Sequence, residues 1–262
     1  MTNDQINNSI NKFTEFLETC RLSKNKVKLT SNSESTPFAL CFYIFCLNLI
    51  GDKVQLNKFK FDWDDELRRN LTVYKDTRVK LGFKPDLDKP YLQLLTFTLS
   101  ALSIIGTLKN NPLEEYTIFV KNIDINKRLN LFGASEGLPK SGNFAMFYGV
   151  LLIHCKEYLN CNVESKIDDW VGYHLKSINR FGFWGSFNSM SHLQFQNGYH
   201  QYEIFNYLKI ENPLISNAIK NILAIADENG HFAPYIGGGS CYDYDAIFIL
   251  SQCKNCLLYT SP

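Results

Sequence analysis

The chain has 262 residues, of which 45% are hydrophobic, so it is long enough to bury a large core as one big domain or two small ones. Its 27 basic and 26 acidic residues leave a net charge of +1, which argues against the strong field expected of a protein that binds nucleic acid or anionic membranes. No basic segment followed by an apolar one opens the chain, so the sequence predicts no secretory signal. The most apolar runs, 37–50 and 91–108, are too short or too interrupted by polar residues to predict a transmembrane segment.

Eight cysteines are scattered along the chain, mostly inside apolar helical runs. Without an export signal, this distribution indicates reduced thiols and predicts a cytoplasmic protein.

The C-terminal residues 256–262 read CLLYTSP. The DNA of a widely used transposon sequencing adapter translates to CLLYTS, so we expect these residues not to be native. The native domain is then expected to cover residues 1–255 as a fragment truncated at its C-terminus.

Helical periodicity dominates the sequence, and β-type alternation is scarce, so we predict an all-α protein. Helix starts are supported by cap residues and early prolines in SESTP, DKP and NP. The predicted helices, in chain order, cover 4–20, 34–50, 63–81, 88–108, 113–122, 142–160, 165–179, 198–209, 213–227 and 242–255.

Two kinds of helix alternate: one is apolar nearly all round, and the other has a charged face. This alternation indicates an inner and an outer layer. The inner helices begin near Pro37, Pro90, Asn143, Tyr199 and Tyr242, at spacings of 53, 53, 56 and 43 residues, which are typical of helical-hairpin repeats.

Two stretches support the repeat at the residue level. YHQYEIF (199–205) aligns with YDYDAIF (242–248), and NRFGFWGSF (179–187) aligns with DENGHFAPY (227–235). We therefore predict an α/α toroid, an incomplete (α/α)6 barrel of helical-hairpin repeats, with an open solenoid as the alternative.

An outer helix, a G-F-W-G turn and a polar start to an apolar inner helix resemble the repeat of squalene cyclases and of protein prenyltransferase β subunits. The resemblance covers residues 165–252 best. It implies the toroid fold and a substrate bound in a central cavity, although a fold does not fix a function.

If the inner helices are parallel, their N-termini meet on one face, where free N–H groups and helix dipoles attract anionic groups. The sequence places polar residues at these ends: Ser33, Glu34, Ser35, Asp88, Lys89, Tyr91, Ser141, Asn143, Asn197, Tyr199, His200, Cys241, Asp243 and Asp245.

Asp243 and Asp245 have two readings. In the first interpretation, Asp243 caps the helix and Asp245 is a favourable charge in its first turn. In the second, the two form a paired acid, in which one carboxyl has a raised pKa and donates a proton. Class II terpene cyclases carry D-x-D-D-T-A on the comparable helix, with the middle aspartate as the acid. The D-Y-D-A of this chain lacks one carboxylate and the threonine.

Cys241 invites a comparison with the zinc-binding Asp-x-Cys pair of prenyltransferase β subunits. Gly239 stands where the aspartate would be, so no metal site is predicted, and Cys241 is expected to be a buried structural cysteine. The sequence identifies no cofactor.

The segment NGYHQYE (197–203) contains more polar and titratable side chains than a packing helix needs. In the repeat alignment His200 occupies the same position as Asp243. His200 is predicted to be a general acid or base, with a hydrogen-bonded structural histidine as the alternative. Trp184 and Tyr235 are expected to stack on a sugar or to stabilise a carbocation. The predicted catalytic residues are Asp243, Asp245, His200 and Glu203, and the predicted substrate-binding residues are Glu34, Asp88, Asn143, Asn197, Tyr199, Tyr202, Trp184, Tyr235 and Tyr244.

Three functions follow as hypotheses. The first is an enzyme of the terpenoid cyclase or prenyltransferase type acting on an isoprenoid. The second is a carbohydrate-active toroid, a hydrolase or lyase with paired carboxylates acting on a glycan. The third is a helical-repeat scaffold without catalysis.

Overall fold

A computed structural model describes residues 2–186, 189–235 and 239–252. These residues are helical and form no extended strand, as predicted for an all-α protein. The helices are α1 (Asn3–Cys20), α2 (Pro37–Leu49), α3 (Lys53–Lys80), α4 (Lys89–Ile104), the 3-10 helix η1 (Glu114–Thr117), α5 (Ile118–Lys121), α6 (Ile125–Leu131), α7 (Ser141–Glu157), α8 (Glu164–Ser177), α9 (His192–Leu208), α10 (Ile215–Ala224) and α11 (Ser240–Ser251).

The chain divides into two compact units, Met1–Glu115 and Tyr116–Pro262. A single toroid over residues 1–255 stays a prediction, and the adapter-like residues 256–262 lie outside the described residues.

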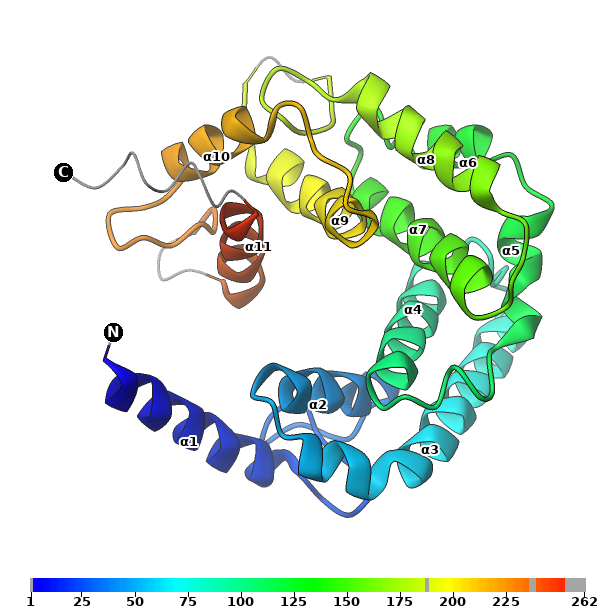
Figure 1. Ribbon diagram of the computed structural model, residues 1–262, viewed down its shortest axis with the longest axis vertical. Coiled ribbons are helices and arrows are strands. Elements are labelled where there is room, and N and C mark those ends of the chain that lie inside the picture. Colours follow the sequence, from blue (N-terminus) through cyan, green and yellow to red (C-terminus); the bar gives the residue numbers. More distant parts are fainter. Residues whose placement is uncertain (1, 187–188, 236–238, 253–262) are drawn as a thin grey trace. The chain divides into compact units, whose positions relative to one another are not determined.

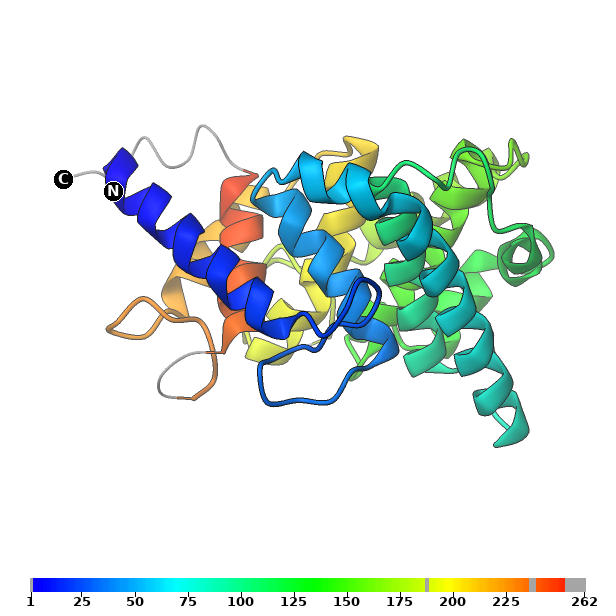
Figure 2. The same ribbon diagram turned by 90° about the horizontal axis from the view of Figure 1, so that it is seen from below.

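In the first unit, α2 and α4 pack against each other, and α3 lies along both (Figures 1 and 2). Most of α2 is buried because it is apolar on nearly every side. On α3, Trp63 is fully buried and donates its indole N–H to the carbonyl of Lys24 at 2.9 Å, which fastens the loop between α1 and α2.

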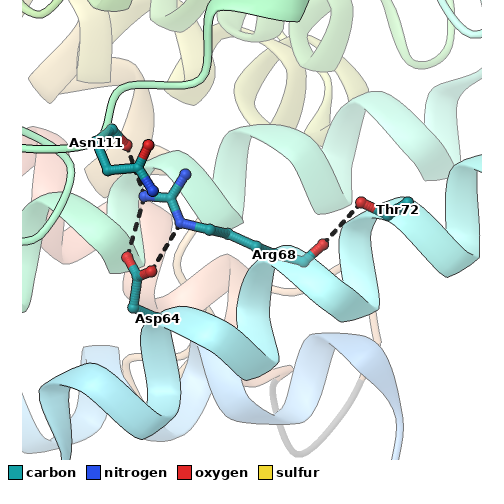
Figure 3. A network of polar contacts seen from close by, with 4 residues as sticks. All are labelled: Asp64, Arg68, Thr72 and Asn111. Carbon is teal, nitrogen blue, oxygen red and sulfur yellow. Dashed lines mark hydrogen bonds and ion pairs between the residues drawn. The ribbon is translucent and has the colours of Figure 1, made fainter.

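Arginines of α3 tie this helix to the segments around α4. Arg68 binds Asp64 at 2.8 Å and donates to the carbonyl of Asn111 at 2.7 Å, while Thr72 bonds back to the Arg68 carbonyl at 3.0 Å (Figure 3). The bond from Arg68 to Asn111 holds the loop after α4 on the surface of α3, and the other two bonds lie within α3.

In the second unit, α7, α9 and α11 lie side by side, with α6 and α8 packed on α7 and α10 packed on α11 (Figure 1). Residue pairs show that the three helices run parallel. A side chain at Gly142 would meet Asn197, and one at Gly149 would meet Ile204, so both helices advance together. Between α9 and α11, the ring of Phe195 lies 6.3 Å from that of Tyr242, and further along both helices the ring of Tyr199 lies 5.4 Å from that of Phe248. These two helices therefore also run in the same direction.

The apolar helices begin at more even intervals along the chain than the sequence alone predicts. The apolar helices α2, α4, α7, α9 and α11 begin at spacings of 52, 52, 51 and 48 residues. Before each of the last four, a glycine with positive φ donates its N–H to the carbonyl three residues back, at 2.9–3.0 Å. These glycines are Gly82, Gly133, Gly182 and Gly230, and only glycine adopts this conformation without strain.

The predicted alignment of NRFGFWGSF with DENGHFAPY is confirmed by its hydrogen bonds. The Asn179 side chain accepts from the N–H groups of Phe181 and Phe183, and the Asp227 side chain accepts from those of Asn229 and His231. The two turns therefore match residue for residue, 48 positions apart.

The predicted alignment of YHQYEIF with YDYDAIF is wrong. The turns and the N-caps Ser191 and Gly239 are both 48 residues apart, so His200 does not correspond to Asp243. Asp243 corresponds to Phe195 instead. In the earlier hairpin Phe195 contacts Phe183 with ring centroids 6.4 Å apart, and in the last hairpin Asp243 binds His231 at 2.9 Å in the same place.

The alignment failed because α9 begins at His192, not at the predicted residue 198. Its first turns, HLQFQNG, are rich in amides that favour a loop in isolation. In the structure, Ser191 caps the helix by accepting from the Gln194 N–H at 3.3 Å, and Gly198 leaves the space that Phe183 fills. Two further differences concern α3 and α6. Helix α3 begins at Lys53 rather than at residue 63, with Asp52 as its cap, and α6 was not predicted as a helix.

A glycine pair tests the close packing of α7 on α9. We expect Gly142→Ala to lower the free energy of unfolding by about 1–3 kcal/mol, because the added carbon would lie 2.0 Å from the Asn197 carbonyl oxygen. Gly172→Ala in α8 is the control: its site is open, so the change should raise stability by about 0.5–1 kcal/mol. Urea denaturation measures both, and equal effects of the two changes would contradict the close contact.

Candidate functional site

Two of the predicted substrate-binding residues, Glu34 and Asp88, belong to the first unit. Glu34 is exposed in the loop before α2. Asp88 is buried and receives two hydrogen bonds from Arg78, at 2.7 and 2.8 Å. The prediction that Asp88 binds substrate is therefore corrected: it joins the end of α3 to the start of α4.

A small polar cavity of about 250 Å³ opens at the start of α2, with Ser35, Thr36 and Lys26 on one side and Glu66 and Arg69 on the other. Arg69 is held by Glu66 at 2.6 Å, and none of the predicted site residues lines the cavity. The cavity is smaller than a typical ligand pocket.

Three predicted substrate-binding residues of the second unit hold the hairpins together instead. Asn197 is buried and donates to the carbonyls of Gly137 and Leu138, at 3.4 and 3.1 Å. Tyr202 donates its hydroxyl to the Gly182 carbonyl at 2.7 Å. Trp184 is buried and donates its indole N–H to the carbonyl of His174 at 2.8 Å. Their polar atoms are used within the fold, so none of the three is free to face a substrate.

Asp243, predicted to be catalytic, binds two residues of the turn before α11. Its carboxylate accepts the Phe232 backbone N–H at 2.8 Å and lies 2.9 Å from His231 Nδ1. These bonds lower the pKa of Asp243, that from Phe232 first and that from His231 second, and the Asp243 contact raises the pKa of His231. Asp243 is therefore an ionised anchor for the turn and not a proton donor, which corrects its predicted role.

Tyr235 and Cys241 lie at the surface of the last hairpin. Tyr235 stands over Gly239 and contacts the ring of Tyr242 at 6.2 Å, and Cys241 is exposed. The prediction that Cys241 is a buried structural cysteine is wrong. No three metal-ligating side chains come together in the ranges that the structure covers, 2–186, 189–235 and 239–252.

Five of the polar residues do meet, and we call Asn143, Tyr199, His200, Glu203 and Asp245 the carboxyl cluster. Asn143 comes from α7, Asp245 from α11, and the other three from two successive turns of α9. Tyr199 donates its hydroxyl to Glu203 Oε1 at 2.7 Å. His200 Nδ1 lies 3.4 Å from Glu203 Oε2, and His200 Nε2 lies 2.8 Å from Asn143 Nδ2. A carboxylate is thus held between a tyrosine and a histidine.

Asp245 is the most perturbed group of the cluster. It is 6% exposed, and no hydrogen bond to its carboxyl is formed by the described part of the chain. Burial, followed by the negative charge of Glu203, raises the pKa of Asp245 from 3.8 to about 8. Asp245 is therefore largely a neutral carboxylic acid at pH 7, with an ionised carboxylate beside it.

Aromatic rings flank the cluster. The Tyr199 ring stands nearly perpendicular to those of Tyr244 and Phe248, with centroids 6.0 and 5.4 Å away. Burial raises the pKa of Tyr199, and Glu203 adds to the shift, so its hydroxyl stays protonated as a donor. Tyr244 is 55% exposed and offers its ring to solvent or to a ligand.

The sequence reading missed Phe248 and His231. Both residues can be found from the glycine turns, which are 48 residues apart. At this spacing Phe248 occupies the position of His200 in the previous repeat, and His231 occupies the position of Phe183. The shorter alignment hid both pairs.

Comparison with protein-family models, with curated proteins and with solved structures gave no significant match. Within the ranges that the structure describes, each helix is too short or too polar to span a lipid bilayer.

The raised pKa of Asp245 predicts a pH dependence of stability. Its folded-state pKa of about 8 lies above its ordinary value of 3.8, so between these values the unfolded chain binds fewer protons at this site than the folded one. Stability therefore falls as pH rises, by about 1.4 kcal/mol per pH unit at most, and the loss is complete above pH 8. Urea denaturation of the wild type and Asp245→Asn at pH 4–9 should show the wild type losing stability relative to the variant through this window. Parallel curves would contradict a raised pKa.

Proposed function

We propose that this chain is an acid–base enzyme of the terpenoid cyclase type, with Asp245 as the proton donor to an isoprenoid substrate. The observation that carries the proposal is the burial of the Asp245 carboxyl, without a hydrogen-bond partner in the described residues, next to the Glu203 carboxylate. A carboxyl in this setting keeps its proton at neutral pH, and its pKa lies near the operating pH, where a general acid is most effective.

In the proposed reaction, the Asp245 O–H bond breaks and its proton forms a C–H bond with one carbon of a substrate double bond. The π electrons of that double bond make the new bond, which leaves a carbocation at the other carbon and a carboxylate on Asp245. The cation closes a ring by taking electrons from a second double bond, and loss of a proton then gives the neutral product. The acid is restored directly when the Asp245 carboxylate takes this proton; when water takes it, Asp245 regains a proton from the solvent.

The surroundings of Asp245 suit such an intermediate. The faces of aromatic rings attract cations, and Tyr199, Tyr244 and Phe248 supply three rings at this place. Glu203, held by Tyr199 at 2.7 Å and facing His200 at 3.4 Å, adds a fixed negative charge.

A second candidate is a glycan hydrolase. It is favoured by the contrast between a protonated Asp245 and a charged Glu203, because glycoside hydrolysis uses one carboxylic acid and one carboxylate. In that reaction Asp245 would protonate the glycosidic oxygen, and the Glu203 carboxylate would activate water or attack the sugar.

Isotope labelling separates the two candidates. The protein is incubated in D2O with squalene, with its epoxide and with a panel of nitrophenyl glycosides, and the products are followed by mass spectrometry and absorbance. A cyclase places a deuterium from Asp245 on carbon, whereas a hydrolase releases nitrophenol and leaves carbon unlabelled. Asp245→Asn should lower either activity about 100-fold or more.

Asp243→Asn is the matched control, with the same chemical change two residues away on α11. It should lower thermal stability, because it weakens the contact with His231, and leave turnover nearly unchanged. The proposal fails if Asp245→Asn retains full activity, or if only Asp243→Asn removes it.

A further inference from the structure

Within the carboxyl cluster, Asn143 of α7 contacts His200 of α9. Its Nδ2 lies 2.8 Å from Nε2 of His200 on α9. The amide nitrogen of asparagine carries two protons and only donates, so Nε2 of His200 must accept with its lone pair. The proton of the neutral ring is therefore on Nδ1.

The Nδ1 proton points toward Glu203, since Nδ1 lies 3.4 Å from Oε2. The other oxygen of Glu203 accepts the Tyr199 hydroxyl at 2.7 Å. Each carboxylate oxygen thus has a donor of its own. In the opposite tautomer, His200 would turn a lone pair toward Oε2, and two acceptors would repel each other.

The backbone explains why an asparagine at this position can reach His200. At Gly142, the preceding residue, a side-chain carbon would lie 2.0 Å from the Asn197 carbonyl oxygen, so α7 and α9 touch here through their main chains. This contact leaves the short side chain of Asn143 within hydrogen-bond distance of a ring two turns above the start of α9.

We propose that Asn143 is a positioning residue, which holds His200 in the Nδ1–H tautomer and thereby fixes the Glu203 carboxylate beside Asp245. The role of this arrangement in turnover rests on the proposed function, but the tautomer itself does not. His200 acts as an oriented donor, and Asn143 acts through it without touching the substrate.

Nitrogen-15 NMR of the histidine rings at a pH of about 8.5, where ordinary histidines are neutral, reads the tautomer directly. His200 is assigned by the loss of its signals in His200→Gln. The wild type should show a proton on Nδ1 and a bare Nε2. Asn143→Asp replaces the donor by an acceptor, so Nε2 should gain a proton.

Three controls make the result decisive. Asn206→Asp is the same change at an exposed position of α9 and should leave the Nδ1–H tautomer intact. Asn143→Leu, folded by circular dichroism, should lose the preference for Nδ1–H. Glu203→Gln should keep it, because Asn143 still donates to Nε2.

A wild-type ring protonated on Nε2 would overturn the proposal. So would an Nδ1–H tautomer that persists in Asn143→Asp, or one that is lost in Glu203→Gln and kept in Asn143→Leu, since Glu203 would then set it. If the cyclase or glycosidase assay gives turnover, Asn143→Asp should lower it about tenfold or more, with little change in KM. An absence of turnover in the wild type counts against the proposed function alone, because the tautomer is measured without substrate.

Discussion

The second unit depends on the main-chain contact between α7 and α9. Gly142 and Gly149 remove the side chains that would keep these helices apart, and the gap closes until Asn197 and Ile204 lie against the α7 backbone. Close-packed interiors transmit position accurately, because each atom is in contact with its neighbours. The place of Asn143, the orientation of His200 and the position of Glu203 all follow from this contact.

Two buried polar side chains of the resulting layer donate to main-chain carbonyls, whereas one buried carboxyl has a strongly raised pKa. Asn197 and Tyr202 each give their donors to carbonyls of the glycine turns or of the loop before α7. Asp245 has no such bond within the described residues, and burying a carboxyl without a partner costs free energy unless it keeps its proton. Carboxyl groups with strongly perturbed pKa values are concentrated at functional sites, which is why the proposed chemistry centres on Asp245.

How far the sequence predicts the structure can be judged from single residues. The all-α class and the aromatic-glycine turns were predictable, because helical periodicity and glycine next to aromatic residues are local signals. Asp245 was also found, since it follows a glycine-rich segment at a helix start. The role of Asp243 was not predictable, because its partner His231 is identified only through the 48-residue spacing of turns. The start of α9 was missed because its amides are satisfied by the Asn179 side chain and by carbonyls of the loops before α7 and α9.

The glycine turns also divide the repeat into a constant part and a variable part. Each of the four glycines keeps the same left-handed geometry, yet the next helix begins 7, 8, 10 and 10 residues later. Chain length can therefore change between the turn and the helix without disturbing the joint itself. In such an architecture these connections are the natural places for insertions, and new surface loops can be acquired there while the packed layers keep their register.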